Sequence, residues 1–199
     1  MIWSKGSKVT AAPASEPITA TTAKTWLKIE SGVTADDTII TSLIASARAE
    51  IENETGLALF TQTIQDTLDA WPEYEEVSNP HMAFHLMRYP VQSVTSISYV
   101  DGDGATQTWA SANYIVDTTG TFCRIAPEAG ITFPGLRNRI NAVTVTYTAG
   151  WALAADIPED LKTALQLMLT YVYERRADSV KQYKTAAENI VQKRYVPVL

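Results

Sequence analysis

Apolar residues recur at helical spacing in three segments of the chain. The clearest segment is predicted to form a helix that begins at Asp36 or Asp37 and ends at Gly56, a residue suited to a left-handed C-terminal cap. The apolar positions of this helix, three or four residues apart, are Ile40, Leu43, Ile44, Ala47 and Ile51. This spacing predicts an amphipathic helix that buries one face.

Two further helices are predicted, one before this segment and one near the end of the chain. The first is short, and Thr19, Thr21 or Thr22 is expected to cap it. The second is expected to run from Pro158 to about Arg176, because proline is favourable at the first position of a helix. Its apolar stripe consists of Leu161, Leu165, Met168 and Val172.

Between the second and third helices the apolar period changes to two. The segments there are short, rich in Thr and Val, and separated by turn residues, which is typical of an antiparallel sheet. The predicted strands lie within residues 61–71, 93–100, 106–110, 113–117, 121–125 and 141–150.

This order of elements predicts an α+β fold. We expect the N-terminal helices and the late amphipathic helix to form a small helical bundle, because each has one apolar stripe that needs a partner, with an antiparallel β region inserted at about 61–150. Residues 1–17 lack an apolar period and are predicted to be a flexible N-terminal arm. Residues 18–176 are then one domain, and residues 177–199 form a C-terminal tail.

Composition narrows the functional classes. The net charge of −6 and the pI near 4.9 argue against a protein whose whole surface neutralises nucleic acid. The charge is uneven, with −6 in residues 61–157 and +2 in residues 158–199. The single cysteine, Cys123, predicts a reducing compartment. No signal peptide is expected, and the most apolar stretch, residues 165–173, is too short for a membrane span.

The turn between the last predicted strand and the last helix invites a nucleotide-binding interpretation. Gly150 follows the strand, but no further glycine stands at Rossmann or P-loop spacing. Glu159 and Asp160 occupy the first helical turn and would repel a phosphate. We therefore predict that this turn is scaffolding.

Two short motifs invite a metal-binding interpretation. The sequence Asp-Gly-Asp-Gly at 101–104 alternates oxygen ligands, but a calcium loop would require a glycine at 106 and an acid at 112, where the chain has Thr106 and Ala112. A hairpin turn is favoured. His81 and His85 are four residues apart, as in helical zinc sites, but their segment resembles a strand without a third ligand. No cofactor or metal is predicted.

Acidic and aromatic residues leave two other interpretations open. The acids Glu73, Glu75 and Glu76 could be paired carboxylates of a hydrolase, although a solvated loop is favoured. The tryptophans could form a sugar-stacking platform, most readily through Trp71 and Trp109 on one exposed face, although single core anchors are favoured. The alternative function is therefore a carbohydrate- or surface-binding β module that decorates a particle.

Three stretches, in order, carry a resemblance to a known family. They are "TWLKIE" with "DDTIITSLIASARAEIENETGLALFTQT" (within 25–63), "YPVQSVTSISYVDGDG" (89–104) and "AVTVTYTAGWALAADIPEDLKTALQLMLTYVYERR" (142–176). Together they span about three-quarters of the chain and resemble the head-to-tail connector, or adaptor, proteins of long-tailed bacteriophages and prophages.

The resemblance implies a structural virion protein without enzymatic activity, made in the host cytoplasm and located at the head–tail interface. Such proteins form a ring, typically of twelve copies, beneath the portal protein. The ring extends the DNA channel and presents a platform for the tail or stopper protein. DNA is expected to pass through without specific binding, since an acidic wall repels it. No membrane contact is expected.

The C-terminal residues are the predicted partner-binding site. The last five are suited to lying extended on a partner, unless they are simply a frayed terminus. The preceding basic residues are suited to steering this segment onto an acidic portal surface, unless they are simply solvated. The predicted partner-binding residues are Arg175, Arg176, Lys193, Arg194, Tyr195, Val196, Pro197, Val198 and Leu199.

Overall fold

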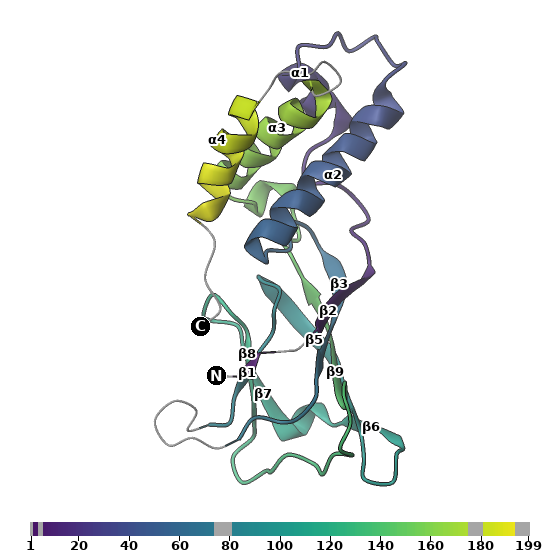
Figure 1. The fold of residues 1–199 in the computed structure, drawn as a ribbon, viewed down its shortest axis with the longest axis vertical. Helices are drawn as coiled ribbons and strands as arrows, with labels where there is room; N and C mark the ends of the chain where they lie inside the picture. The colour runs from purple at the N-terminus through teal and green to yellow at the C-terminus, as the bar shows by residue number, and fades with distance from the viewer. Residues whose placement is uncertain (1, 4–5, 74–80, 175–180, 194–199) are drawn as a thin grey trace. The chain divides into compact units, whose positions relative to one another are not determined.

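The computed structural model describes residues 2–3, 6–73, 81–174 and 181–193 (Figure 1). The chain divides into two compact units. The β unit consists of Thr61–Gly150 and the residues up to Pro13, and the helical unit consists of Ala14–Phe60 and the residues from Trp151 onward. Helices and antiparallel sheets confirm the predicted α+β fold.

The helical unit contains four α-helices within the described residues. They are α1 (Ala20–Trp26), α2 (Asp37–Thr55), α3 (Glu159–Glu174) and α4 (Lys181–Gln192), and a 3₁₀ turn, η2 (Ala154–Asp156), precedes α3. The predicted capping residues define the start of α1 and the end of α2. The hydroxyl of Thr19 accepts the N–H of Thr22 at 3.1 Å, and Gly56 closes α2 with φ +74°.

The core of the helical unit lies between the apolar stripes. Helix α3 contacts α1, α2 and α4, and α4 (yellow in Figure 1) lies alongside α3. Ile40, Ile44, Ile51, Leu161, Leu165 and Leu169 are all at most 1% exposed. None of the described helices is long and apolar enough to cross a membrane.

Helix α4 corrects the predicted C-terminal tail, because residues 181–192 are helical and packed. Ala187 and Val191, four residues apart, are fully buried in the helical unit. This i,i+4 apolar pair gives α4 a face that packs against α3. Basic residues that precede Ala187, among them Lys181 and Lys184, interrupt the apolar pattern, so this short periodicity was not recognised in the sequence.

The described residues of the β unit form two sheets. The five-stranded sheet has the order β2-β3-β9-β5-β6, and the four-stranded sheet has the order β1-β4-β8-β7. All pairings are antiparallel except that of β1 with β4. The strands are β1 (Ile2–Trp3), β2 (Gly6–Ala11), β3 (Gln62–Leu68), β4 (Phe84–His85), β5 (Val91–Val100), β6 (Thr106–Trp109), β7 (Tyr114–Asp117), β8 (Arg124–Pro127) and β9 (Val143–Ala149), with a 3₁₀ turn, η1 (Ser111–Asn113), between β6 and β7.

Strand β2 corrects the predicted flexible arm. Residues 6–11 pair antiparallel with β3, with Gly6 opposite Thr67 and Val9 opposite Ile64. As an edge strand, β2 is stabilised by backbone hydrogen bonds to β3 while most of its side chains are exposed. Such a strand needs no apolar period, so its Ser, Lys and Thr residues resembled an unstructured segment.

Candidate functional site

The turn at Gly150 is occupied by the fold's own hydrogen bonds. The N–H of Gly150 donates to the carbonyl of Pro90 at 2.8 Å, and its carbonyl accepts the side-chain amide of Gln92 at 2.6 Å. Gly150 has φ +104°, a conformation that a side chain would strain. The glycine therefore closes the end of β9, as predicted, with its backbone groups already used.

The Asp-Gly-Asp-Gly motif forms the predicted hairpin turn between β5 and β6. One carboxylate oxygen of Asp101 accepts the N–H groups of Asp103 and Ala105, and the other accepts the side-chain amide of Gln107 at 2.9 Å. The Gln107 contact, followed by the backbone contacts, lowers the pKa of Asp101. The carboxylate that would lead a calcium loop therefore holds the turn instead.

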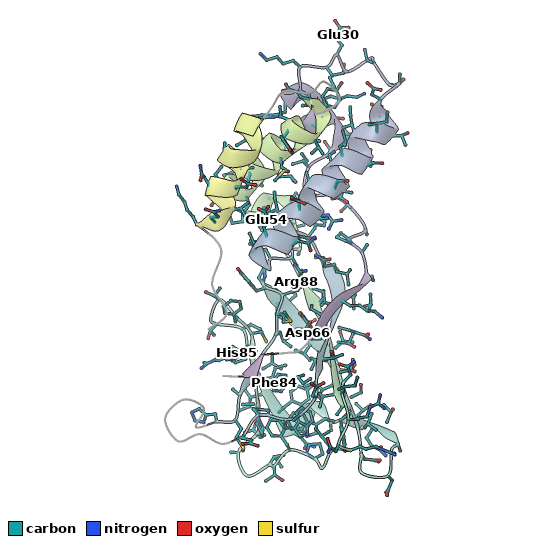
Figure 2. All side chains as sticks on the ribbon, viewed as in Figure 1. Glu30, Glu54, Asp66, Phe84, His85 and Arg88 are labelled. Atoms are coloured by element: carbon teal, nitrogen blue, oxygen red, sulfur yellow. The ribbon has the colours of Figure 1, made fainter. Side chains whose placement is uncertain are left out.

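The two histidines differ in environment. His85 (labelled in Figure 2) lies in β4, is 9% exposed, and stands opposite Arg124 of β8. His81 precedes the strand and is exposed. Burial, followed by the charge of Arg124, lowers the pKa of His85. Among the described residues, His, Cys, Asp and Glu side chains do not gather in groups of three that could hold a metal ion.

Trp71 and Trp109 of the β unit form part of an aromatic cluster in its interior. Trp109 is 4% exposed, and its ring centroid lies 5.3 Å from that of Trp71. Trp71 stacks on Phe133 at 4.6 Å and donates its indole N–H to the carbonyl of Pro134 at 2.9 Å. Phe84, Tyr99 and Tyr114 complete the cluster. Trp109 is buried, and Trp71 is half-buried with its ring stacked on Phe133, which counts against an exposed sugar-stacking platform at these two residues.

Of the three acids that could be paired carboxylates of a hydrolase, only Glu73 lies within the described residues. Glu73 is exposed, and Glu75 and Glu76 lie outside the described residues.

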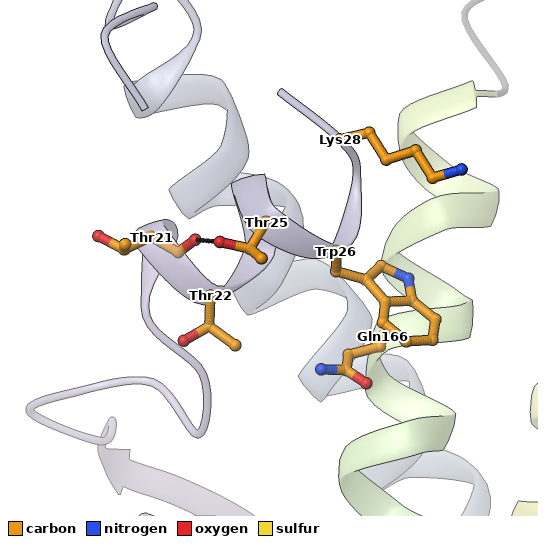
Figure 3. Close-up of a pocket in the computed structure, with 6 residues that line it drawn as sticks. All are labelled: Thr21, Thr22, Thr25, Trp26, Lys28 and Gln166. Atoms are coloured by element: carbon orange, nitrogen blue, oxygen red, sulfur yellow. Dashed lines mark hydrogen bonds between the residues drawn. The ribbon is translucent and has the colours of Figure 1, made fainter. Parts of the chain in front are cut away.

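A surface pocket lies on the helical unit between α1 and α3 (Figure 3). Trp26 is 42% exposed there, and its indole N–H donates to the hydroxyl of Thr170 at 2.8 Å. The described lining residues carry no carboxylate, histidine or thiol, so the pocket has no general acid–base pair. Its lining residues are Thr21, Thr22, Thr25, Trp26, Lys28 and Gln166.

Of the predicted partner-binding residues, only Lys193 lies within the described chain. It follows α4 directly and is exposed. Arg175 and Arg176 fall between α3 and α4, outside the described residues, and so do Arg194, Tyr195, Val196, Pro197, Val198 and Leu199.

Sequence reasoning missed a buried ionic cluster in the helical unit. Arg48 of α2 donates to Glu16 at 2.8 Å and to Glu52 at 2.7 Å, and Glu52 also accepts the N–H of Leu59. Burial opposes the charged guanidinium, but the hydrogen bond to Glu16 and the charges of Glu52 and Glu16 outweigh it and raise the pKa of Arg48. Glu16 is 32 residues from Arg48, so only the i,i+4 spacing of Arg48 and Glu52 was visible in the sequence.

The single thiol should be unreactive while the β unit is folded. Cys123 is 2% exposed, and burial, followed by the charge of Asp117, raises its pKa to about 12. We expect labelling by a thiol-specific disulfide reagent at pH 8 to be at least about a hundredfold slower than after unfolding. Thr118→Cys, at an exposed position, is the control and should label at once in the folded protein. Equal labelling rates at both positions would show that Cys123 is accessible.

Comparison with known proteins decides the family. The chain matches the family model of the head completion protein over residues 16–194. It belongs to the head completion protein family. This membership confirms the resemblance to head-to-tail connectors and makes the chain a structural virion protein of a phage-like particle.

Three solved structures share the fold of this head completion protein. One is the neck of an empty gene transfer agent particle computed with C6 symmetry, with a TM-score of 0.79 and 24% identity over 98% of this chain and 97% of that chain. Another is the virion of the native particle, with a TM-score of 0.77 and 24% identity over 97% of each chain. A third is the neck of the native particle computed with C12 symmetry, with a TM-score of 0.69 and 21% identity over 96% of this chain and 97% of that chain. No curated protein sequence matches the chain.

Proposed function

We propose that this head completion protein is an adaptor that assembles as a ring beneath the portal, extends the DNA channel and provides the platform for the tail or stopper. The family match over residues 16–194 carries this proposal. The structures of similar fold come from necks computed with C6 and C12 symmetry, which supports a cyclic assembly, and we expect twelve copies.

The charge of the chain supports a passive channel. A net charge of −6 disfavours tight contact with DNA phosphates, so DNA would slide through the ring rather than adhere to it. The motifs that first suggested chemistry at Gly150 and Asp101 hold turns. A protein that acts as scaffolding needs these residues only to hold the turns, which is what they do in the structure.

Light scattering of the chain with and without its portal tests the ring. We expect a complex whose added mass corresponds to about twelve chains of 21.8 kDa on each portal ring. Binding of one or two chains would contradict the adaptor ring.

The C-terminal segment is proposed to contact the portal, with Arg175, Arg176, Lys193 and Arg194 steering it and Tyr195–Leu199 docking extended. Deletion of residues 195–199 should leave the thermal unfolding midpoint unchanged and weaken portal binding at least about tenfold, because the extended contact is lost. A variant with Gly and Ser at the same five positions keeps the length and should bind as weakly. Unchanged binding of both variants would show that the portal contact lies elsewhere.

A further inference from the structure

Two apolar side chains are far more exposed than the other large apolar residues described. Ile140 of the β unit is 75% exposed and Leu153 of the helical unit is 62% exposed, whereas the next, Ile115, is 48% exposed. Single exposed apolar residues are ordinary on protein surfaces. Ile140 and Leu153 differ from such isolated residues, because Ile140 has positively charged neighbours and Leu153 has negatively charged ones.

Ile140 stands at the end of a long loop, residues 128–142, beside two arginines. Arg137 and Arg139 are both exposed, and neither forms an ion pair with a described residue. We call Arg137, Arg139 and Ile140 the basic patch. The loop has no helix or strand, and loops of this length are often functional.

The loop that carries the basic patch is nevertheless fixed to the β unit. Phe133 stacks on Trp71, the N–H of Arg137 donates to the carbonyl of Val100 at 3.0 Å, and that of Asn141 donates to a carboxylate oxygen of Asp69 at 2.8 Å. A preorganised surface loses little entropy on binding a partner. The exposed side chains are therefore presented on a rigid base.

Leu153 lies in the turn before α3, beside exposed acidic residues. The N–H of Asp156 donates to the carbonyl of Leu153 at 3.0 Å, which holds the two residues in one turn. Asp156 is exposed. The side chain of Glu159 is 86% exposed and forms an ion pair with Lys162. We call Leu153, Asp156 and Glu159 the acidic patch.

We infer that the basic patch of one copy packs against the acidic patch of the next copy, as the two halves of a contact between ring neighbours. This inference rests on the proposed ring. A cyclic assembly needs heterologous contacts, in which two different surfaces of the same chain meet. An apolar residue flanked by arginines and an apolar residue flanked by carboxylates are complementary in both character and charge.

DNA is a less suitable partner for the basic patch. A DNA backbone presents phosphates and sugars, so it would pair with the arginines but leave Ile140 without an apolar contact. A protein surface with an apolar centre matches Ile140 better.

Charge reversal tests this contact in rings assembled on the portal. Arg137→Glu with Arg139→Glu, and separately Asp156→Arg with Glu159→Arg, should each lower the yield of rings at least about tenfold, because like charges then face one another. The variant that carries all four substitutions should recover most of the yield, since opposite charges face again. Glu30→Arg, exposed in the helical unit outside both patches, is the control and should assemble normally.

The outcomes separate this contact from the proposed function. Full ring yield in both reversed variants, or no recovery in the fourfold variant while its circular dichroism matches the parent, would overturn the contact but leave the ring intact. Failure of the parent chain to form rings on the portal would overturn the proposed function itself. Loss of rings in the Arg137→Glu, Arg139→Glu variant with full yield in the Asp156→Arg, Glu159→Arg variant would also overturn the contact and assign the arginines to another partner, such as DNA.

Discussion

Replacing Arg48 with methionine is expected to lower the free energy of unfolding of the helical unit by about 3–5 kcal/mol. The guanidinium is the shared partner of two carboxylates, and its side chain is 11% exposed. Methionine fills similar volume but removes the cation that Glu16 and Glu52 share, and the Glu52 side chain is only 8% exposed. Removing one member of a buried ionic cluster costs far more than the cluster contributes as a whole.

Urea unfolding followed by circular dichroism at 222 nm measures the effect of this change, because the helices dominate that signal. Arg48→Lys keeps the charge but cannot reproduce the forked contact with both acids, so an intermediate loss is expected. Lys162→Met removes the surface pair with Glu159 and should change stability by at most about 0.5 kcal/mol. A loss below about 1 kcal/mol for Arg48→Met would show that the two carboxylates find other partners.

Replacing Asp66 with alanine is expected to destabilise the β unit by about 2–4 kcal/mol. Asp66 (labelled in Figure 2) is fully buried in β3. The alternating burial of the strand places it on the same face as the core residues Ile64 and Leu68. One of its carboxylate oxygens accepts the hydroxyl of Tyr147 at 3.0 Å and the N–H of Met87 at 2.8 Å. Burial, followed by the charge of Asp66, raises the pKa of Tyr147, so this phenol remains a donor. Alanine would leave both donors without that acceptor.

The tryptophan fluorescence of Trp71 and Trp109 follows unfolding of the β unit. Asp66→Asn retains a carbonyl acceptor and should lose less stability than alanine. Tyr147→Phe removes the hydroxyl that donates to Asp66 and accepts the N–H of Arg88, and should cost about 1–2 kcal/mol. Asp103→Ala, in the exposed turn, is the matched control and should stay within about 0.5 kcal/mol of the parent. If Asp66→Ala were as stable as the control, the hydrogen bond from the N–H of Met87 to Asp66 would not contribute to the stability of the β unit.

Local signals predicted much of the fold. The α2 boundaries at Asp37 and Gly56, the Thr19 cap and the hairpin turn at Asp101 are each determined by residues within a few positions of one another. The alternation along β3 and β9 appears as alternating burial in the structure, because each strand has one face on the core.

Long-range pairing determined what the sequence could not predict. Strand β2 exists because β3, more than 50 residues away, supplies its hydrogen bonds, and α4 exists because α3 covers Ala187 and Val191. Asp66 falls within the strand predicted at 61–71, but its role as a buried acceptor depends on Tyr147, which is 81 residues away. Similarly, the hydrogen bond from Trp71 to Pro134 spans 63 residues, so the aromatic cluster has no local signature.

Electron microscopy of particles from cells in which the gene for this chain is inactivated tests the connector role most directly. The account predicts heads and tails that are each complete but unattached, with joining restored when the parent chain is supplied. Tailed particles in normal numbers without the chain would contradict it.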